Sequence, residues 1–383
     1  MEIIINSPSL NPAENVSGIS AVTRFIIDNN GTRQYVHFTL GRKDKERGGW
    51  RRVAALVGRY GAWKRLLGEH PGALIHYNLP LSRASLLRDP WFMGYALRHH
   101  RRMVVHVHGG RLLTAGHIPL ALRPVLKWIF GRKVTFVALS EGERDTLKER
   151  FGARRVEVLP NCVDLADARD YAREKEKPDG DGTLRVGYLG RIEPNKGMTE
   201  LLEAGTRLKE AGVDFRLCLA GKEQTEGEYL PEFRQRLDGR FRYKGVVSGR
   251  SKCDFLRSLD VFVLPTYFEG LPMSLLECMS YGIVPVTTPV GSIPQVVRDG
   301  ANGLFIQPHD VESIVEALRR LDKDRSLLRR LGEEARKTIF DKFSTEEYIK
   351  KLNEIYHELT SSTVWPDRVS KAGRHTRGAV IHQ

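Results

Sequence analysis

The chain has 383 residues, with 61 Lys and Arg against 47 Asp and Glu, a net charge of +14, 41% hydrophobic residues and four cysteines. This length and composition predict a globular protein of about two domains, and they exclude collagen-like, disordered and disulfide-stapled chains. The cysteines stand at least 25 residues apart, so no C-x-x-C pair is present to bind zinc. We expect them to be buried residues in a reducing compartment.

Short apolar runs alternate with helix-length patterns along the first half of the chain. Strands are expected at six of these runs: residues 3–5, 35–39, 73–77, 103–108, 135–139 and 156–159. Helical patterns lie between them, for example at 20–28 and 141–151. Such an alternation predicts βαβ units, and hence a parallel sheet covered by helices.

The alternation stops at residues 164–183, a charged segment that ends in Pro and Gly, and resumes beyond them. Strands are then expected at 184–189, 215–220, 241–243, 261–264, 284–287 and 304–306, and helices at 198–211, 272–281 and 311–321. The sequence therefore predicts two doubly wound α/β domains, whose ligands bind beyond the carboxyl ends of the strands.

The domain boundaries follow from this break in the pattern. Residues 1–165 are expected to form the first domain, 166–183 the linker and 184–344 the second domain. A helix around 345–360 is expected to pack back on the first domain, and the polar tail at 361–383 to be loosely ordered.

Nearly all of the excess positive charge lies in the first half, where residues 1–170 hold 27 Lys and Arg against 15 Asp and Glu. These cations stand in runs mixed with aromatic and aliphatic residues at 42–67, 98–102 and 120–133, a pattern that suits an anionic membrane surface. A solvated basic face is the plainer interpretation. No helix-turn-helix, zinc-finger or RNP-like pattern accompanies the charge, so we expect no nucleic-acid partner.

The sequence contains no apolar window of about 18 residues, and its first ten residues lack the basic start of a signal peptide. We therefore expect a cytoplasmic protein. If the basic runs bind lipid, it is peripheral on the inner face of the cytoplasmic membrane.

The strongest functional pattern is DVFVLPTYFEGLPMSLLECMSYG, at residues 260–282. A buried strand runs into a loop and then into a helix that is expected to open at Pro272 and close at Gly282. Free amides at a helix start favour an anion, whereas Glu269 before this helix and Glu277 inside it repel one. Sugar hydroxyls are natural partners for two such carboxylates, although either residue alone could equally be a solvated charge.

The second pattern is LRVGYLGRIEPNKG, at residues 184–197. A buried strand enters a turn that carries Arg191 and Lys196, a guanidinium fork and an ammonium that together suit a diphosphate. Two solvated cations are the alternative at this point. Neither a Walker loop nor G-x-G-x-x-G is present, which disfavours a P-loop or a hydride-transfer enzyme.

Together these segments resemble the retaining glycosyltransferases of family four, which have the GT-B fold. The resemblance is carried by the E-x7-E pair Glu269 and Glu277, the element Gly190, Arg191 and Lys196, and the segments at 138–147, 159–164 and 285–303. It extends over residues 134–352. It implies an α/β GT-B fold, in which two Rossmann-like domains face a cleft, the first binding the acceptor and the second the nucleotide sugar.

The resemblance also implies roles for residues of the second domain. Arg191 and Lys196 would hold the diphosphate of the donor, and Glu277 would bind its ribose. Glu269 would contact the donor sugar, with the amides of Gly270 and Leu271 beside it. The turn at 245–247 would carry the base, so Val247 joins the donor-binding set.

Two residues of the first domain complete the implied site. His108, at the end of the strand that also carries His106, would face the donor sugar and joins Glu269, Arg191 and Lys196 as a candidate catalytic residue; whether it is catalytic or only orients the sugar stays open. Gly18 would let the backbone approach the diphosphate. Many relatives have two glycines there, whereas this chain has Ser17.

The implied reaction moves a sugar from a UDP- or GDP-sugar to a glycan, with retention of configuration, in polysaccharide or lipopolysaccharide biosynthesis. Arg191 and Lys196 would neutralise the leaving phosphate, so no metal and no cofactor are expected. The D-x-D triplet at 179–181 lies in the expected linker, away from any strand. A transferase with a soluble small acceptor, a sugar-nucleotide epimerase and a non-catalytic binding subunit are the alternatives.

Overall fold

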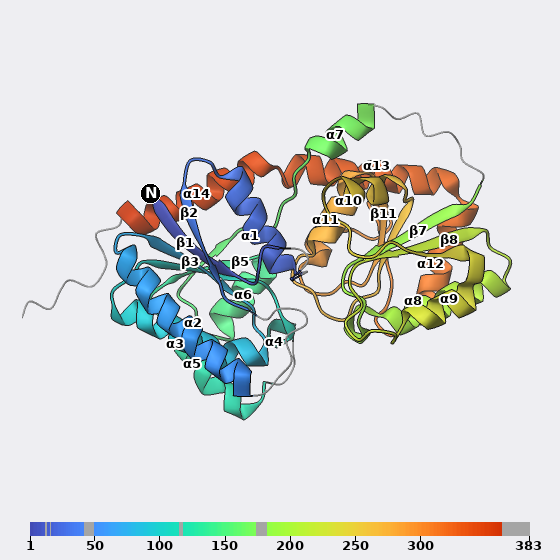
Figure 1. Cartoon of the computed structure of the whole chain (residues 1–383). Helices are drawn as coiled ribbons and strands as arrows, with labels where there is room; N and C mark the ends of the chain where they lie inside the picture. The colour runs from blue at the N-terminus through green and yellow to red at the C-terminus, as the bar shows by residue number, and fades with distance from the viewer. Residues whose placement is uncertain (12–13, 16, 42–49, 115–117, 174–181, 362–383) are drawn as a thin grey trace, which may run out of the picture.

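The computed structural model describes residues 1–11, 14–15, 17–41, 50–114, 118–173 and 182–361. It contains two parallel six-stranded sheets that lie side by side, each covered by helices on both faces (Figure 1). This α/β architecture confirms the predicted fold class.

The first sheet has the strand order β2-β1-β3-β4-β5-β6, with every neighbouring pair parallel. Its strands are β1 (Glu2–Ser7), β2 (Gln34–Thr39), β3 (Leu74–Leu79), β4 (Met103–Val107), β5 (Thr135–Ala138) and β6 (Arg155–Val158). Its helices are α1 (Gly18–Asn29), α2 (Trp50–Glu69), α3 (Arg83–Arg98), α4 (Arg111–Thr114), α5 (Arg123–Phe130) and α6 (Glu141–Glu149). β3 and β4 are buried along their whole length, which explains why they appear in the sequence as continuous apolar runs.

The second sheet has the strand order β12-β11-β10-β7-β8-β9 and is also parallel. Its strands are β7 (Leu184–Leu189), β8 (Phe215–Ala220), β9 (Phe241–Tyr243), β10 (Val261–Leu264), β11 (Val284–Thr287) and β12 (Leu304–Phe305). Its helices are α8 (Met198–Glu210), α9 (Leu230–Leu237), α10 (Gly249–Arg257), α11 (Met273–Ser280), α12 (Val311–Lys323) and α13 (Arg325–Lys342).

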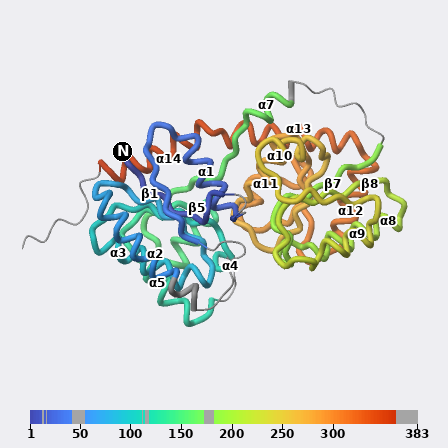
Figure 2. Tube along the Cα trace, viewed as in Figure 1, coloured from blue at the N-terminus to red at the C-terminus, as the bar shows by residue number. Residues whose placement is uncertain are grey.

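The last helix, α14 (Thr345–Ser361), follows α13 and lies along the first sheet (Figure 2). Its Tyr356 hydroxyl hydrogen-bonds His76 of β3 at 2.6 Å, and its Asn353 contacts Asn30 at the end of α1 at 3.2 Å. Buried residues of α14 also belong to a hydrophobic cluster that runs from the first sheet into the second. The helix therefore ties the two sheets together.

Three local expectations differ from the structure. Pro272 is the N-cap of α11 and not its first helical residue, with extended backbone angles of −67° and 126°. The strand expected at 103–108 ends at Val107, which leaves His108 in the loop beyond it. Helix α7 (Ala166–Arg173) opens the interval that was expected to be the linker, and its Asp167 is ion-paired with Arg257 at 2.9 Å.

None of the helices among the described residues is long and apolar enough to cross a bilayer.

Candidate active site

The two sheets meet where the loop after β4 contacts the loop after β10. Gly109 has a positive φ of 65°, and a Cβ placed on it would lie 2.6 Å from the Cα of Gly270. Only glycine permits both that backbone angle and that approach. Consequently, the residue after His108 and the residue after Glu269 touch one another, and the sequence-predicted residues of the two halves come together.

Lys196 and Glu269 form an ion pair in this region. Gly197 makes the contact possible, because its φ is 69° and a Cβ there would lie 2.1 Å from the carbonyl oxygen of Pro265. The turn that carries Lys196 therefore packs against the end of β10, beside the loop that carries Glu269. The cation predicted to hold phosphate and the carboxylate predicted to contact sugar are neighbours.

Arg191 lies in the same turn and is partly buried. The backbone at this point is fixed, since the Tyr188 hydroxyl donates to the carbonyl oxygen of Arg191. The amide of Gly221 donates to the carbonyl of Gly245 at 2.8 Å, and Val247 lies just beyond it, partly buried against the core. The turn expected to carry the base is thus held next to the end of β8.

Glu277 lies on α11, and its Oε1 accepts from the Nζ of Lys252 on α10 at 2.6 Å. The two side chains are 17% and 33% exposed, so part of each remains open to a ligand. Sequence reasoning missed Lys252. Its partner is 25 positions away on another helix, and no local pattern joins the two.

The loop between Glu269 and α11 is held from both halves of the chain. The carbonyl of Gly270 accepts from the amide of Ser292 at 3.0 Å. The carbonyl of buried Leu271 accepts from the Nδ2 of Asn161 at 2.7 Å. Asn161 belongs to the LPNCVD segment, so this segment braces the candidate donor loop.

His108 is partly buried, and its Nε2 lies 2.6 Å from the Oδ1 of Asn78. Its ring lies against that of His106, with centroids 4.2 Å apart and the ring planes tilted by 31°. Burial, together with the neighbouring His76, lowers the pKa of His108 to about 3. The imidazole is therefore neutral at physiological pH.

Gly18 is the first residue of α1, and it is exposed. The hydroxyl of Ser17 caps the helix by accepting from the amide of Ser20 at 3.2 Å. A Cβ on Gly18 would meet no atom of the chain within 4 Å. The helix start is open, and nothing within the described chain requires glycine there.

Glu143 is a further residue of this region that sequence reasoning missed. It is buried at the start of α6, where its Oε2 accepts from the amide of Leu139 at 3.0 Å and its Oε1 from the hydroxyl of Ser292 at 3.1 Å. Burial raises its pKa from 4.5 to about 7. The spacing of Ser140 and Glu143 could have marked a capped helix start, but not a contact between the two halves.

The D-x-D triplet at 179–181 lies outside the described residues. Among the residues that the structure describes, no group of three or more His, Cys, Asp or Glu side chains is arranged to hold a metal ion.

Two parallel six-stranded sheets that meet at the carboxyl ends of their strands have the architecture of the GT-B fold. Two family models match the chain: Glycosyltransferase Family 4 over residues 34–167 and Glycosyl transferases group 1 over residues 170–338. The chain belongs to glycosyltransferase family four.

Individual relatives agree with this assignment. The alpha-D-kanosaminyltransferase of Streptomyces kanamyceticus is 27% identical over 77% of this chain and 80% of its own length. A UDP-Gal:alpha-D-GlcNAc-diphosphoundecaprenol alpha-1,3-galactosyltransferase of Escherichia coli is 26% identical over 67% of this chain and 69% of its own. The Anabaena protein Alr3699/HepE, solved in complex with UDP and glucose, has a TM-score of 0.71 at 17% identity and covers 94% of this chain and 100% of its own.

Proposed function

We propose that this protein is a retaining, metal-independent transferase that moves a sugar from a UDP-sugar to a hydroxyl of a glycan. The observation that carries the proposal is the Lys196–Glu269 ion pair beside Arg191, at the point where Gly109 touches Gly270. The UDP complex of the Anabaena protein and the UDP-sugar named for the Escherichia coli relative support UDP as the nucleotide.

In the proposed donor complex, Arg191 and Lys196 bind the diphosphate. Departure of UDP places negative charge on the β-phosphate, and two fixed cations stabilise that charge in the transition state more than in the ground state. Glu269 holds Lys196 in position and faces the sugar, with Gly270 and Leu271 beside it. Glu277 contacts the ribose, Val247 the base, and Gly18 the diphosphate from the opposite side.

Transfer with retention requires the acceptor hydroxyl to attack from the face that the phosphate leaves. We assign the proton of that hydroxyl to the departing phosphate oxygen. His108, with a pKa of about 3, is too weak a base for this proton and carries no charge, so its proposed role is to orient the sugar. The two halves exclude water where they close around the reacting atoms.

The donor assignment is tested by thermal unfolding in EDTA with UDP, GDP, ADP and their sugars. A ligand at 100 times its Kd adds about 2.7 kcal/mol to the free energy of unfolding, which is readily measured. We expect a shift with UDP that Arg191→Ala/Lys196→Ala abolishes. The matched control is Lys350→Ala/Lys351→Ala, which removes two exposed cations of α14. No shift with any nucleotide would refute the proposed donor site.

The first half offers a surface for a membrane-bound acceptor. Among the described residues, four of its five exposed large hydrophobic residues lie on elements that pack in sequence, α2 on α3 and α3 on α5: Val57 of α2, Leu87 and Trp91 of α3, and Leu120 just before α5. The fifth is Met1. Leu87 and Trp91 are four residues apart, hence on one side of α3, and Trp91 is 68% exposed. Isolated exposed residues of this kind need no explanation, but a group of four on adjacent helices does.

Positive charge accompanies these apolar residues. A hollow of about 570 Å³ lies between α5 and the end of α6, and its charged lining is three cations, Arg123, Lys127 and Arg150, against one carboxylate, Glu149. Its apolar lining includes Leu126 and Phe151. Cations around apolar groups suit the anionic headgroups and upper chains of a bilayer. We therefore propose that the first half docks on an anionic membrane and presents a lipid-linked glycan to the donor, in cell-surface polysaccharide or lipopolysaccharide assembly.

Vesicle flotation tests this part of the proposal. We expect the protein to float with vesicles of anionic phospholipid at low salt and to be released by high salt, since surface charge is screened. Leu87→Ser/Trp91→Ser should weaken binding, whereas Val246→Ser, at an exposed position of the second half, should not. Donor binding without any vesicle binding would instead favour the transferase with a soluble acceptor.

A further inference from the structure

Three histidines and a tyrosine form a continuous array under the candidate sugar site, buried except at His108, which is partly buried. His76 and His106 are buried completely within β3 and β4, and the ring of His106 lies against that of His108 at an interplanar angle of 31°. The Nδ1 of His106 lies 3.2 Å from the Nε2 of His76, and the Nδ1 of His76 lies 2.6 Å from the hydroxyl of Tyr356. The array runs from the loop after β4 to helix α14.

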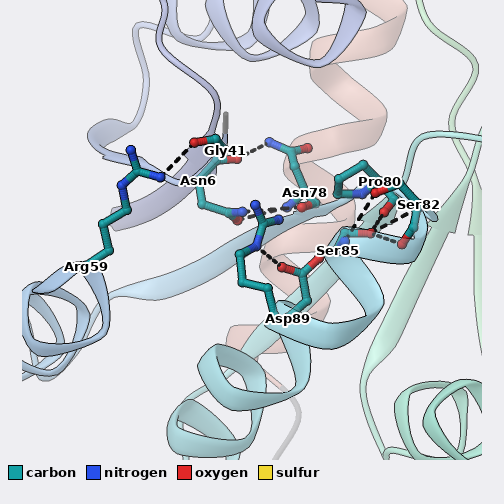
Figure 3. Close-up of polar contacts among 9 residues, drawn as sticks. Asn6, Gly41, Arg59, Asn78, Pro80, Ser82, Ser85 and Asp89 are labelled. Atoms are coloured by element: carbon teal, nitrogen blue, oxygen red, sulfur yellow. Dashed lines mark hydrogen bonds and ion pairs between the residues drawn. The ribbon is translucent and has the colours of Figure 1, made fainter. Parts of the chain in front are cut away.

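The contact with Asn78 determines which ring nitrogen of His108 carries the hydrogen. The Nδ2 of Asn78 donates to the carbonyl of Asn6 at 2.7 Å (Figure 3). It also donates to the hydroxyl of Thr23 at 3.1 Å, so the Oδ1 of Asn78 must face the imidazole of His108. An amide oxygen only accepts, hence the Nε2 of His108 carries the hydrogen. The Nδ1 of His108 then carries a lone pair and can accept a hydrogen bond from a hydroxyl group.

The tautomers of His76 and His106 depend on one another, because the two rings share a hydrogen bond. Burial lowers the pKa of His76 to about 3 and that of His106 well below its ordinary value, so each ring carries a single N–H. If the Nδ1 of His76 donates to Tyr356, its Nε2 must accept from the Nδ1 of His106. If Tyr356 donates instead, both rings take the opposite tautomer.

The surroundings favour the first arrangement. The Nε2 of His106 is buried and has no hydrogen-bond partner within the described residues. An unpartnered lone pair there is less costly than an unpartnered N–H, so His106 keeps its hydrogen on Nδ1. Tyr356 then accepts from His76 and can direct its own hydrogen to Tyr35, with which it is also bonded.

We propose that Tyr356, His76 and His106 are positioning residues that hold His108 in place against Asn78, and that helix α14 is thereby part of the donor-sugar site. The inference rests on the proposed function, in which His108 orients the sugar. Removal of the Tyr356 hydroxyl would orphan the N–H of His76 or switch the tautomers of both buried histidines. The second outcome would move the hydrogen of His106 from Nδ1 to Nε2, in the ring that lies against His108.

The test compares Tyr356→Phe with Tyr348→Phe in the full-length protein. Both tyrosines are buried on α14, but the Tyr348 hydroxyl has no hydrogen-bond partner within the described residues. Tyr348→Phe therefore controls for the loss of a buried hydroxyl on this helix. We expect Tyr356→Phe to lower kcat/KM for the UDP-sugar about five- to tenfold, as for one lost hydrogen bond, with unchanged affinity for UDP. Tyr348→Phe should leave kcat/KM unchanged.

Histidine tautomers provide a second measurement that does not depend on activity. Long-range 1H–15N NMR of histidine-labelled protein should show hydrogen on Nδ1 of His76 and His106 in the wild type, and a changed pattern in Tyr356→Phe only. Equal kcat/KM for the two variants, together with unchanged tautomers, would overturn the inference. A wild type that neither binds UDP nor transfers sugar would refute the proposed function instead, and the tautomer pattern would still test the array.

Discussion

Glu143→Gln is the most informative single change in the contact between the two halves. The glutamine has the same shape, so its amide can accept from the amide of Leu139 and donate to the hydroxyl of Ser292, which preserves both contacts of the native side chain. The substitution removes only the ability to ionise. Its effect on stability therefore isolates the titration of this carboxyl.

The sign and size follow from its pKa of about 7, against 4.5 for an ordinary glutamate. Between these values the folded protein keeps a proton that the unfolded chain releases, so stability is full below pH 4.5 and falls as the pH rises towards 7. Each tenfold change in the ionisation constant corresponds to about 1.4 kcal/mol, and the total is about 3 kcal/mol. Glu143→Gln cannot lose this stability.

Urea unfolding across this pH range measures the difference. The free energy of unfolding of Glu143→Gln should rise relative to the wild type by up to about 3 kcal/mol from about pH 5 to about pH 8, and then level off. Glu141→Gln is the control, because it removes a carboxyl from the same helical turn where the side chain is 60% exposed. Parallel curves for wild type and Glu143→Gln would refute the reasoning.

Four further predictions concern the same region. Gly109→Ala should block the contact with Gly270 and lower transfer at least about tenfold without loss of UDP binding, whereas Gly152→Ala, which also has a positive φ but meets no atom, should leave transfer unchanged in kinetic assays. Asn161→Ala should cost about 1–2 kcal/mol in urea unfolding, because it removes the donor to the Leu271 carbonyl. Lys252→Met should weaken UDP binding in calorimetry, since Glu277, proposed to contact the ribose, loses the cation that holds it. Asn78→Asp should raise the pKa of His108 by giving it an anionic partner, and transfer should then fall toward acid pH in a pH–rate profile whose acid side is flat for the wild type.

Much of the fold could be predicted because the inner strands of both sheets are buried on both faces. The expected strands at 184–189 and 261–264 coincide with β7 and β10. Boundaries were less accurate where a loop continues the apolar run, as at His108, or where proline precedes a helix, as at Pro272. The helix α7 was not expected, because four of its eight residues are charged and it contains no large aliphatic side chain.

The candidate site was predictable as a set of residues but not as a set of contacts. Lys196 and Glu269 are 73 positions apart and meet because β7 and β10 are neighbours in a sheet whose order differs from the chain order. Glu143 and Ser292 are 149 positions apart, and they lie in different halves of the molecule. Local patterns identify a helix start or a basic turn. They do not reveal which carboxylate faces which cation or which half of the molecule holds a loop.

The two halves of the site differ in charge, and the difference matches the proposed reaction. The second half contributes Arg191, Lys196 and Lys252, where UDP would leave with negative charge. The first half contributes a neutral His108 and the buried carboxyl of Glu143, whose raised pKa keeps much of it protonated near neutral pH. Positive charge develops on the sugar as UDP departs, so a cation in the first half would oppose the reaction, and an anion there would compete with the phosphate for the cations. Neutral groups held by hydrogen bonds can orient a sugar without opposing the positive charge on it and without competing with the phosphate for the cations.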